Sequence, residues 1–358
     1  MRILMKTRKE ALEHPGGDTV QMLRLKEELE KRGHFPTVST YGEDDLKKYD
    51  LVHFFNLFDS SQHRETLSRC RAAGVPWVTT PNFWDPDEYL HACSPSVFLS
   101  ALRALLGMRT SFALVRPFLP PPPSAEIELL RGSRIIFPNS SEEKRQLMHL
   151  HKVPEERFVV VPNGVDAHLF APGETGSFEK EHGVKDFVLC CGRVEDRKNQ
   201  LALIRGMRGI PVPLVLIGDP APYQPEYLEK CRKEAGTLFK ALFLPALPQN
   251  ELVPAYSAAR VHVLPSWWEN TGLVSLEAAL CGCEVVTTDR SPVREYLGDH
   301  AYTCDPSSPD SIKSAIRQAL AGSRSKHARE RIKSCFSWPR SAEILSQGYR
   351  MALEGGNP

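Results

Sequence analysis

The sequence predicts an α/β protein made of two doubly wound domains, each built on a parallel sheet. Its 358 residues fit two domains of about 100–200 residues, and 41% of them are hydrophobic, which is enough for a sizeable core. Short apolar strands alternate with amphipathic helical segments, and this pattern starts again near residue 186. Such alternation indicates parallel strands joined by right-handed crossovers.

The N-terminal half begins with the strand RILM at 2–5, a Gly-Gly loop and a helix over 18–31, with Asp18 as the expected N-cap. Helical spacing lies between most of the strands that follow. These expected strands are LVHFF at 51–55, PWVTT at 76–80, RIIFP at 134–138 and RFVVVP at 157–162. We assign residues 1–165 to this Rossmann-like domain.

The C-terminal half repeats the pattern. Its expected strands are FVLCC at 187–191, PLVLIG at 213–218, ALFLP at 241–245, RVHVLP at 260–265 and CEVVTT at 283–288. We assign residues 166–337 to a second Rossmann-like domain, joined through a Gly- and Pro-rich stretch at 163–183. A last helix over 339–353 has no strand after it, so residues 338–358 are expected to pack back on the N-terminal domain. Because such sheets bind ligands at the carboxyl ends of their strands, two facing domains would enclose a ligand in a cleft.

One segment breaks this alternation. Residues 89–125 contain no acidic residue but include Arg103, Arg109 and Arg116, and SVFLSALRALLGM at 96–108 would form a helix with one apolar face. A core helix followed by a proline-stiffened loop is the simpler interpretation. The alternative is a surface at 96–119 that contacts a membrane or a lipid-linked substrate, because anionic lipid attracts basic amphipathic segments.

Composition disfavours several classes of protein. The formal net charge is +1, without the basic excess of a nucleic-acid-binding protein. No apolar run reaches the roughly 18–20 residues of a membrane-spanning helix, and MRILMK at 1–6 is too short and too charged for a secretory signal. The nine cysteines are scattered and odd in number, which is typical of free thiols in a reducing compartment. We therefore expect a cytoplasmic protein.

Two carboxylates mark the candidate site. Glu269 precedes a helix expected to start near residue 271 or 272, and Glu277 lies about one turn inside it. The free N–H groups and partial positive charge of a helix start favour phosphate, and Gly272 lets a ligand approach the backbone. Carboxylates beside a phosphate site suit neutral hydroxyl groups, so the combination indicates a nucleotide-diphosphate sugar. A solvated Glu269 and a Glu277 paired with an arginine are the alternative.

Cations follow the strand FVLCC in the same domain. Arg193 and Lys198 lie near the strand end, where they would stabilise the charge of a diphosphate leaving group, and Arg197 competes for either role. In the N-terminal half, Gly16 and Gly17 allow close approach to a phosphate, although a plain turn explains them equally. The loop lacks G-x-G-x-x-G spacing, which disfavours a nicotinamide dehydrogenase.

Together these residues resemble glycosyltransferase family 4, whose retaining enzymes have the two-Rossmann architecture called GT-B. The resemblance covers nearly the whole chain and is carried by DLVHFFN at 50–56, FPNSSEEK at 137–144, VVVPNGVDAHLFAP at 159–172, CGRVEDRKN at 191–199, VLIGD at 215–219 and the E-x7-E block at 269–277. It implies that domain 1–165 binds the acceptor and domain 166–337 the nucleotide sugar. Within the latter, it implies that Arg193 and Lys198 bind the donor diphosphate, Glu269 the donor sugar and Glu277 the ribose. It also implies donor contacts from Gly16, Gly17, Gly218, Asn270, Thr271, Gly272 and Leu273, the last three through backbone amides at the phosphate.

Two departures from the family pattern are visible. Relatives often carry a histidine after the fourth strand, near the transferred sugar, where this chain has Pro81 and Asn82. His53 is the nearest substitute, although a histidine inside an apolar strand is more often a core residue. The other departure is DRSPVREYL at 289–297, where many relatives have a Gly-Gly pair and this chain has Pro292.

The resemblance implies a retaining transferase of the hexosyl type, which moves a sugar to a glycan or lipid-linked acceptor in cell-surface polysaccharide or glycoconjugate synthesis. The leaving phosphate would take the acceptor proton, without a protein nucleophile, a metal or another cofactor. Asp85 and Asp87 have the spacing of a manganese site in a different transferase architecture, which the two-domain pattern disfavours. The alternatives are a nucleotide-sugar epimerase of similar architecture and a non-catalytic nucleotide-sugar-binding protein.

Overall fold

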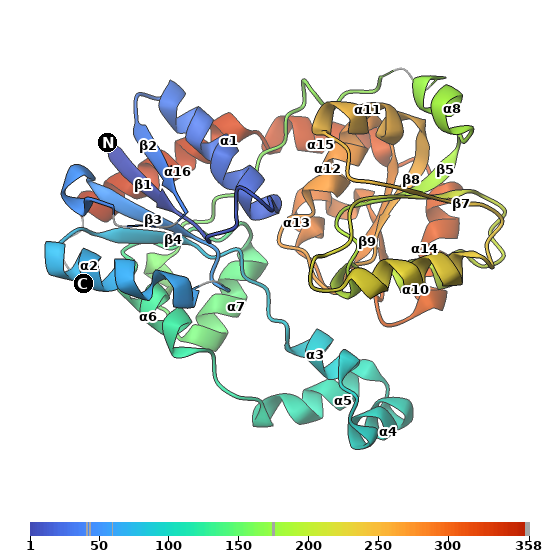
Figure 1. Ribbon diagram of the computed structural model, residues 1–358, viewed down its shortest axis with the longest axis horizontal. Coiled ribbons are helices and arrows are strands. Elements are labelled where there is room, and N and C mark those ends of the chain that lie inside the picture. The colour runs from blue at the N-terminus through green and yellow to red at the C-terminus, as the bar shows by residue number, and fades with distance from the viewer. Residues whose placement is uncertain (41, 43, 59, 174–175, 355–358) are drawn as a thin grey trace. The chain divides into compact units, whose positions relative to one another are not determined.

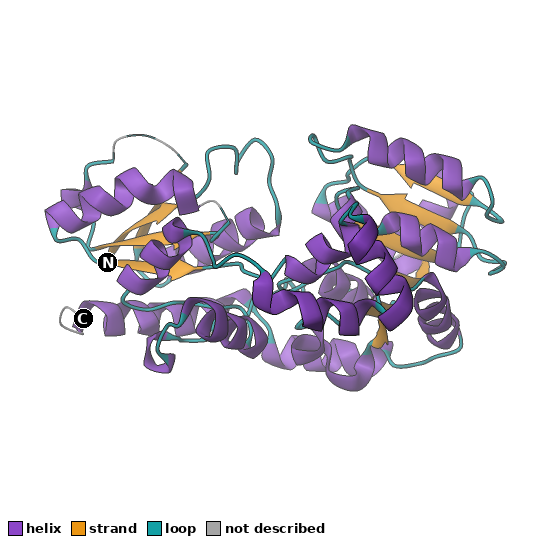
Figure 2. Cartoon of the chain, turned by 90° about the horizontal axis from the view of Figure 1, so that it is seen from below, coloured by secondary structure: helices purple, strands orange, loops and turns teal. Residues whose placement is uncertain are grey.

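Two compact units make up the computed structural model, which describes residues 1–40, 42, 44–58, 60–173 and 176–354. The first unit comprises Met1–Asp85, Leu119–Gly164 and Phe336–Pro358, and the second comprises Pro86–Phe118 and Val165–Cys335. Each contains a parallel sheet flanked by helices (Figure 1, Figure 2), which confirms the predicted α/β class with two Rossmann-like domains. Residues 174–175 of the predicted linker and 355–358 of the predicted C-terminal segment lie outside the described residues.

A four-stranded parallel sheet forms the centre of the first unit. In spatial order its strands are β2 (Phe35–Ser39), β1 (Arg2–Lys6), β3 (Leu51–Phe55) and β4 (Trp77–Thr80). β3 is buried along its whole length, as its apolar sequence predicts. β2 was not predicted, because it is an edge strand that contains Pro36 and has only one fully buried position.

The segments predicted as strands at 134–138 and 157–162 extend this sheet without forming regular strands. They contribute isolated parallel bridges, from Thr79 to Ile136 and from Ile136 to Phe158. Each segment ends in a proline, which has no N–H to donate to a ladder, so the pairing is shorter than predicted.

The C-terminal helix belongs to the first unit. The helices of this unit are α1 (Gly17–Lys31), α2 (Arg64–Ala73), α6 (Ser124–Gly132), α7 (Ser141–His151) and α16 (Trp338–Glu354), with the 3-10 helices η1 (Leu46–Lys48), η2 (Ser60–His63) and η4 (Glu155–Arg157). In α16, Ser341 Oγ donates to Pro162 O at 2.5 Å, and a Cβ on Gly348 would lie 2.3 Å from Phe137 Cε1. The close approach at Gly348 lets α16 pack tightly, and the helix runs beside α1 (Figure 1).

A six-stranded parallel sheet forms the centre of the second unit. In spatial order its strands are β10 (Tyr302–Cys304), β9 (Glu284–Thr288), β8 (Ala259–Leu264), β5 (Phe187–Cys191), β6 (Leu214–Ile217) and β7 (Ala241–Leu244). The predicted segments account for β5 to β9, whereas the three-residue β10 is too short to show a pattern. Strand order reverses between β5 and β8, and doubly wound sheets bind ligands at that point, beyond the carboxyl ends of the strands.

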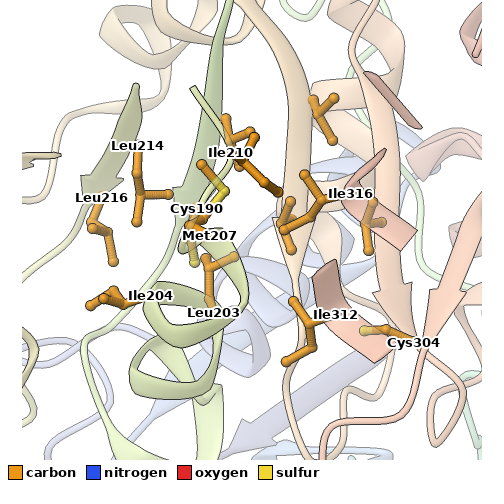
Figure 3. Close-up of a cluster of buried hydrophobic side chains, with 14 of the residues drawn as sticks. Cys190, Leu203, Ile204, Met207, Ile210, Leu214, Leu216, Cys304, Ile312 and Ile316 are labelled. Atoms are coloured by element: carbon orange, nitrogen blue, oxygen red, sulfur yellow. The ribbon is translucent and has the colours of Figure 1, made fainter. Parts of the chain in front are cut away.

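Helices α9 and α14 build the main core of this unit against the sheet. The helices that follow Val165 are α8 (Gly176–His182), α9 (Gln200–Met207), α10 (Pro225–Ala235), α11 (Gln249–Ala258), α12 (Leu273–Cys281), α13 (Val293–Leu297), α14 (Pro309–Leu320) and α15 (Ser325–Cys335), with the 3-10 helices η5 (Asp196–Lys198) and η6 (Gly298–His300). Figure 3 shows Leu203 and Met207 of α9 near Ile312 and Ile316 of α14, all buried. Burying one such side chain contributes about 1.5–3 kcal/mol, so this core fixes the strands that carry the loops described below.

An arm formed by Pro86–Phe118 also belongs to the second unit, whereas the predicted boundary at residue 165 placed it in the first domain. The arm contains α3 (Asp87–Cys93), α4 (Val97–Leu106), α5 (Met108–Val115) and η3 (Arg116–Phe118). The predicted core helix over this segment is wrong: no residue of α4 is buried, and Val97 and Leu105 are 84% and 80% exposed. Apolar spacing gives a helix one apolar face but does not determine what covers it. Within the described residues, no helix is both long and apolar enough to cross a bilayer.

Candidate functional site

Two loops of the second unit meet where the strand order reverses. One follows β5 and carries Arg193 and Lys198, and the other follows β8 and carries Glu269. Trp267 N donates to Arg197 O at 2.9 Å, and Arg197 Nη1 donates to Trp268 O at 3.1 Å. The fold therefore brings together residues about 70 positions apart in sequence, as expected at a doubly wound switch point.

Asn199 adds a further link between these loops. Its φ of +65° places it in the left-handed region, where asparagine is favoured over most other side chains. Its side-chain Nδ2 donates to Pro265 O at 3.1 Å and to Pro306 O at 2.8 Å. Asn199 thus holds the end of β8 next to the cation-bearing loop, a role that sequence alone did not predict.

Glu269 is a buried, ionised carboxylate with cationic partners. It is 8% exposed, Lys198 Nζ donates to its Oε1 at 2.5 Å, and Arg197 Nη1 lies 3.8 Å from the same oxygen. Burial alone would raise the pKa of Glu269, but Lys198 and Arg197 outweigh burial and hold this pKa below its ordinary value. The alternative interpretation, a solvated Glu269, is therefore excluded.

Arg193 and Arg197 differ in how far they are engaged. Arg197 also pairs with Glu195 at 2.6 Å, and its guanidinium lies 5.0 Å from the Trp268 ring centroid. Arg193 is half-buried, and among the described residues no carboxylate lies within ion-pair distance of it. Arg197 is thus engaged by protein partners, whereas the diphosphate-binding role of Arg193 stays a prediction.

Helix α12 begins directly after a glycine in the left-handed conformation. Gly272 caps the helix with φ +67° and ψ 52°, and the backbone amides at the helix start precede its internal hydrogen-bond ladder. A Cβ at Gly272 would lie 3.1 Å from Val293 Cγ2, so a larger residue would be both strained and crowded. Asn270, Thr271 and Leu273 lie on either side of this glycine, at the end of the loop that carries Glu269.

Gly218, which follows β6, is required for close packing of neighbouring loops. Its φ is +152°, and a Cβ there would lie 2.1 Å from the carbonyl oxygen of Gly192. No side chain fits at that distance, so glycine lets the turns after β5 and β6 approach each other. The structure thus places Gly218 beside the loop that leads to Arg193.

Glu277 projects from α12 toward α11. It is 5% exposed, accepts from Tyr256 Oη at 3.0 Å, and its other oxygen lies 3.4 Å from Gln249 Nε2. Tyr256 is fully buried, so its hydroxyl fixes the orientation of the carboxylate. Both of these partners are uncharged side chains.

The predicted Gly-Gly loop lies in the first unit, at the start of α1. Gly16 is the N-cap of this helix and Gly17 its first residue, so the prediction that Asp18 is the cap is wrong. Asp18 instead accepts from Asn56 Nδ2 at 3.2 Å and from Arg8 Nε at 3.5 Å. Its side chain is committed to tying the loop to the end of β3.

His53 lies in the core of the first unit. It is 0% exposed, Nδ1 is 2.7 Å from Tyr349 Oη, and Nε2 is 2.9 Å from Thr80 Oγ1. Burial lowers the pKa of His53 to about 3, so the ring is neutral at physiological pH. Both ring nitrogens have protein partners, which agrees with the core interpretation and leaves neither nitrogen for a sugar.

Asn82 ends a chain of buried amides in the first unit. Gln21 Nε2 donates to Asn139 Oδ1 at 2.6 Å, and Asn139 Nδ2 donates to Asn82 Oδ1 at 2.6 Å. Asn82 is 7% exposed with φ +48°, and in the described part of the chain its Nδ2 has no hydrogen-bond partner. A buried amide group without a partner costs free energy, so a ligand oxygen that accepts from Asn82 Nδ2 would be stabilising.

Pro81 and Phe83 fix the backbone on either side of Asn82. Pro81 O accepts from Leu57 N at 2.6 Å, and Phe83 N donates to Glu143 Oε1 at 2.7 Å. Glu143 is completely buried, and its second oxygen accepts from Asn139 N at 2.6 Å. One carboxylate therefore holds both ends of the amide pair in place, a function that FPNSSEEK did not reveal.

Two family models match the chain, one after the other. The model described as "Glycosyltransferase Family 4" matches residues 15–169, and the model described as "Glycosyl transferases group 1" matches residues 174–334. Together they span nearly all of both units. The chain belongs to glycosyltransferase family 4 and has the GT-B fold.

Curated relatives resemble only part of this chain. The D-inositol 3-phosphate glycosyltransferase of Nocardia farcinica is 28% identical over 263 residues, which cover 67% of this chain and 58% of that protein. The protein of the same name from Mycolicibacterium smegmatis is 30% identical over 231 residues, covering 60% and 52%. The chain thus spans little more than half the length of these relatives.

Solved structures match the fold over the whole chain. Sucrose-phosphate synthase from Thermosynechococcus elongatus superposes with a TM-score of 0.78 at 18% identity, covering 99% of this chain and 100% of that one. Anabaena Alr3699/HepE, crystallised in complex with UDP and glucose, gives a TM-score of 0.73 at 17% identity, covering 98% and 99%. At such low identity these matches establish the fold alone.

Proposed function

We propose that the chain is a retaining glycosyltransferase that moves a sugar from a nucleotide-diphosphate sugar to an acceptor hydroxyl. The observation that carries the proposal is the cluster of Lys198, Arg197 and Glu269 beside the start of α12. A nucleotide sugar combines an anionic diphosphate with a hydroxyl-rich sugar, and this cluster offers cations for the first and a carboxylate for the second. Family membership supports the proposal, and none of the relatives reported above is named as an epimerase.

The existing contacts leave hydrogen-bonding capacity for a donor substrate. Glu269 uses one of the three N–H donors of Lys198, so the ammonium group can also bind phosphate. A carboxylate has about four acceptor positions, so Glu269 can keep Lys198 and still accept from sugar hydroxyls. Glu277, oriented by Tyr256, would accept from the ribose hydroxyls. Arg193 would bind the diphosphate from the loop that follows β5.

Transfer with retention would take place on one face of the sugar. The bond from the anomeric carbon to the leaving phosphate oxygen breaks, the acceptor oxygen bonds to that carbon, and the acceptor proton passes to the leaving phosphate. Lys198, Arg193 and the first amides of α12 stabilise the negative charge that develops on the phosphate. Glu269 positions the sugar and transfers no proton, in keeping with its lowered pKa.

We also propose that transfer requires no metal, because these cations and amides already supply positive charge at the diphosphate. Chelator treatment is therefore expected to leave the rate unchanged. Loss of activity with chelator and recovery with manganese would contradict this proposal. Such a result would favour manganese binding by Asp85 and Asp87.

The arm is proposed to contact an anionic bilayer, which suits a glycan or lipid-linked acceptor at the inner face of a membrane. Phe98 is 70% exposed and Phe118 is 86% exposed, on a segment without acidic residues from 89 to 125. Arg109 and Arg116 are exposed beside them, although Arg109 also pairs with Asp289. Exposed apolar side chains combined with exposed arginines favour anionic lipid over a second copy of this chain, whose arm would carry the same charge.

Flotation with vesicles tests the membrane contact. We expect binding to vesicles that contain phosphatidylglycerol, weaker binding to phosphatidylcholine alone, and loss of binding in a Phe98→Ser/Phe118→Ser variant. Equal binding by this variant would contradict the proposal. So would a dimer in light scattering that the same substitutions abolish, because the surface would then be an interface between copies.

A donor screen followed by product analysis tests the transferase itself. Thermal shifts with UDP, GDP and ADP and their sugars identify the nucleotide, and NMR of the product from a synthetic acceptor reports the anomeric configuration. The proposal expects the same configuration in donor and product. Inverted product, or an isomerised sugar without any acceptor, would contradict it.

A further inference from the structure

Helix α3 of the arm lies against the loop that carries Glu269. Tyr89 of α3 makes ring contacts with Trp268, at a centroid distance of 5.3 Å, and with Trp267, at 6.0 Å. These tryptophans immediately precede Glu269 in the chain. We infer that Tyr89 and Glu88 are positioning residues for Glu269, an inference that rests on the function proposed above.

Tyr89 links three parts of the second unit. Its pKa is raised, first by burial and then by a side-chain hydrogen bond with Asp196, which is in η5 together with Lys198. The Trp268 ring meets both the Tyr89 ring and the Arg197 guanidinium. Aromatic pairs at such distances attract each other through their ring quadrupoles, so Tyr89 restrains the loop from the side of the arm.

Glu88 acts through the neighbouring loop after β9. Both of its oxygens accept from Arg290, at 3.1 Å and 3.2 Å from Nε, and Oε1 also lies 2.9 Å from Nη2. Arg290 is 9% exposed, and although burial would lower its pKa, Glu88 and Asp289 hold it above the ordinary value. A buried guanidinium paired in this way is fixed in orientation.

The residue after Arg290 touches the backbone of Glu269. Ser291 Oγ donates to Glu269 O at 3.2 Å, so the loop that Glu88 anchors also holds the catalytic segment. Glu269 is thus restrained by Lys198 at its carboxylate, by Ser291 at its carbonyl, and through Trp268 by Tyr89. Two of these restraints begin in the arm. One begins at Tyr89, and the other begins at Glu88 and passes through Arg290 and Ser291.

We expect substitutions of Tyr89 and Glu88 to lower the rate of transfer rather than the affinity for the nucleotide. Tyr89 and Glu88 touch neither Lys198 nor the start of α12 in the contacts described, so binding of the nucleoside diphosphate should persist without them. A displacement of about 1 Å in a positioned group can cost about 100-fold in rate. We expect Tyr89→Ala to lower kcat about tenfold, which corresponds to about 1.4 kcal/mol.

The test compares Tyr89→Ala, Tyr89→Phe and Glu88→Gln with Leu90→Ala. Leu90 is on the same helix, is 56% exposed and is outside these contacts, so it is a matched control. The nucleoside diphosphate that binds the wild-type protein serves as the binding probe, measured by calorimetry beside kcat and Tm. We expect Tyr89→Phe to keep most of the rate because it keeps the ring, Glu88→Gln to lose part of it, and Leu90→Ala to match wild type.

Glu269→Ala separates failure of the inference from failure of the proposed function. If Glu269→Ala is inactive while Tyr89→Ala turns over like wild type, the positioning role is wrong and the site stands. If Glu269→Ala itself turns over like wild type, the proposed function is at fault. Equal losses of kcat, nucleotide affinity and Tm in both Tyr89 variants would indicate a purely structural residue and also overturn the inference.

Discussion

The two units place different chemistry beyond the carboxyl ends of their parallel strands. Beyond the carboxyl ends of β5 and β8, the second unit gathers charge around Glu269, Lys198 and Arg197. Beyond the end of β4, the first unit presents neutral amides that end at Asn82. The fold decides where the loops lie, and the side chains on those loops decide what they can bind.

This difference has an energetic consequence. Hydrogen bonds that involve charged groups contribute about 1.5–3 kcal/mol, whereas neutral ones contribute about 0.5–1.5 kcal/mol. The charged cluster suits a diphosphate, and the amide chain suits uncharged hydroxyl groups of a sugar or acceptor. Substitutions in the second unit should therefore have the larger effects and should be the more sensitive to pH and salt.

The largest effect is expected at the charged cluster. Glu269→Ala and Lys198→Ala should each lower turnover by more than about tenfold, or about 1.4 kcal/mol of transition-state stabilisation, because each removes one member of a buried ion pair. Steady-state kinetics on folded variants measure this. Near-normal rates in both variants would remove these residues from the mechanism.

A smaller effect is expected at the amide chain. Asn82→Ala removes a neutral donor, and a neutral hydrogen bond contributes about 1 kcal/mol, so KM for the acceptor should rise about fivefold while nucleotide affinity is unchanged. Asn139→Leu should act in the same direction, because Asn82 loses the partner that orients it. A change in nucleotide affinity with constant acceptor KM would reverse the assignment of the two units.

The pH dependence should distinguish the units further. The pKa of Glu269 lies below its ordinary value because Lys198 and Arg197 outweigh burial, so the ionised form persists as pH falls. Lys198→Ala removes the main cation that opposes burial, so the pKa of Glu269 should rise. The acid limb of kcat/KM should therefore move to higher pH. An acid limb at the same pH in wild type and variant would show that Glu269 does not control it.

The same lowered pKa predicts how stability responds to acid. A carboxyl group whose pKa is lower in the folded state stabilises the fold above its unfolded pKa and loses that contribution as pH falls through the folded value. Wild type should therefore lose more stability than Glu269→Gln on acidification below about pH 4.3, the ordinary pKa of glutamate. Parallel loss of Tm in the two proteins would contradict the ion pair.

Raising the salt concentration should have the smallest effect on the kinetics, and only donor binding by the second unit should change. Raising ionic strength screens attraction between a diphosphate and partly exposed cations such as Arg193, so donor KM should rise modestly. Acceptor KM, governed by neutral contacts, should stay constant. An acceptor KM that rises with salt would point to an anionic acceptor group near cations of the first unit.

Much of the fold could be predicted from sequence because buried parallel strands have short, continuous apolar runs. β5 and β6 are of this kind, and only His53 interrupts the run in β3. β2 and β10 were missed because an edge strand and a three-residue strand bury too little to show a pattern. The arm was assigned to the wrong domain, since its docking depends on contacts such as Arg290 with Glu88, far apart in the chain.

Candidate site residues were predictable where they lie within one local motif. The spacing from Glu269 to Glu277 shows that one carboxylate precedes α12 and the other lies one turn inside it. Partners contributed by other elements gave no such signal: Tyr256 on α11 and Tyr89 on α3 reach the site only through tertiary packing. The buried pairing of Lys198 with Glu269 likewise depends on the adjacency of β5 and β8.

Hydrogen exchange with and without the nucleoside diphosphate shows whether the diphosphate binds at the carboxyl edge of the second unit's sheet. We expect slower exchange in peptides covering 192–199 and 266–276, with no change at 80–84. Unchanged exchange in both 192–199 and 266–276 at saturating nucleotide would contradict this expectation.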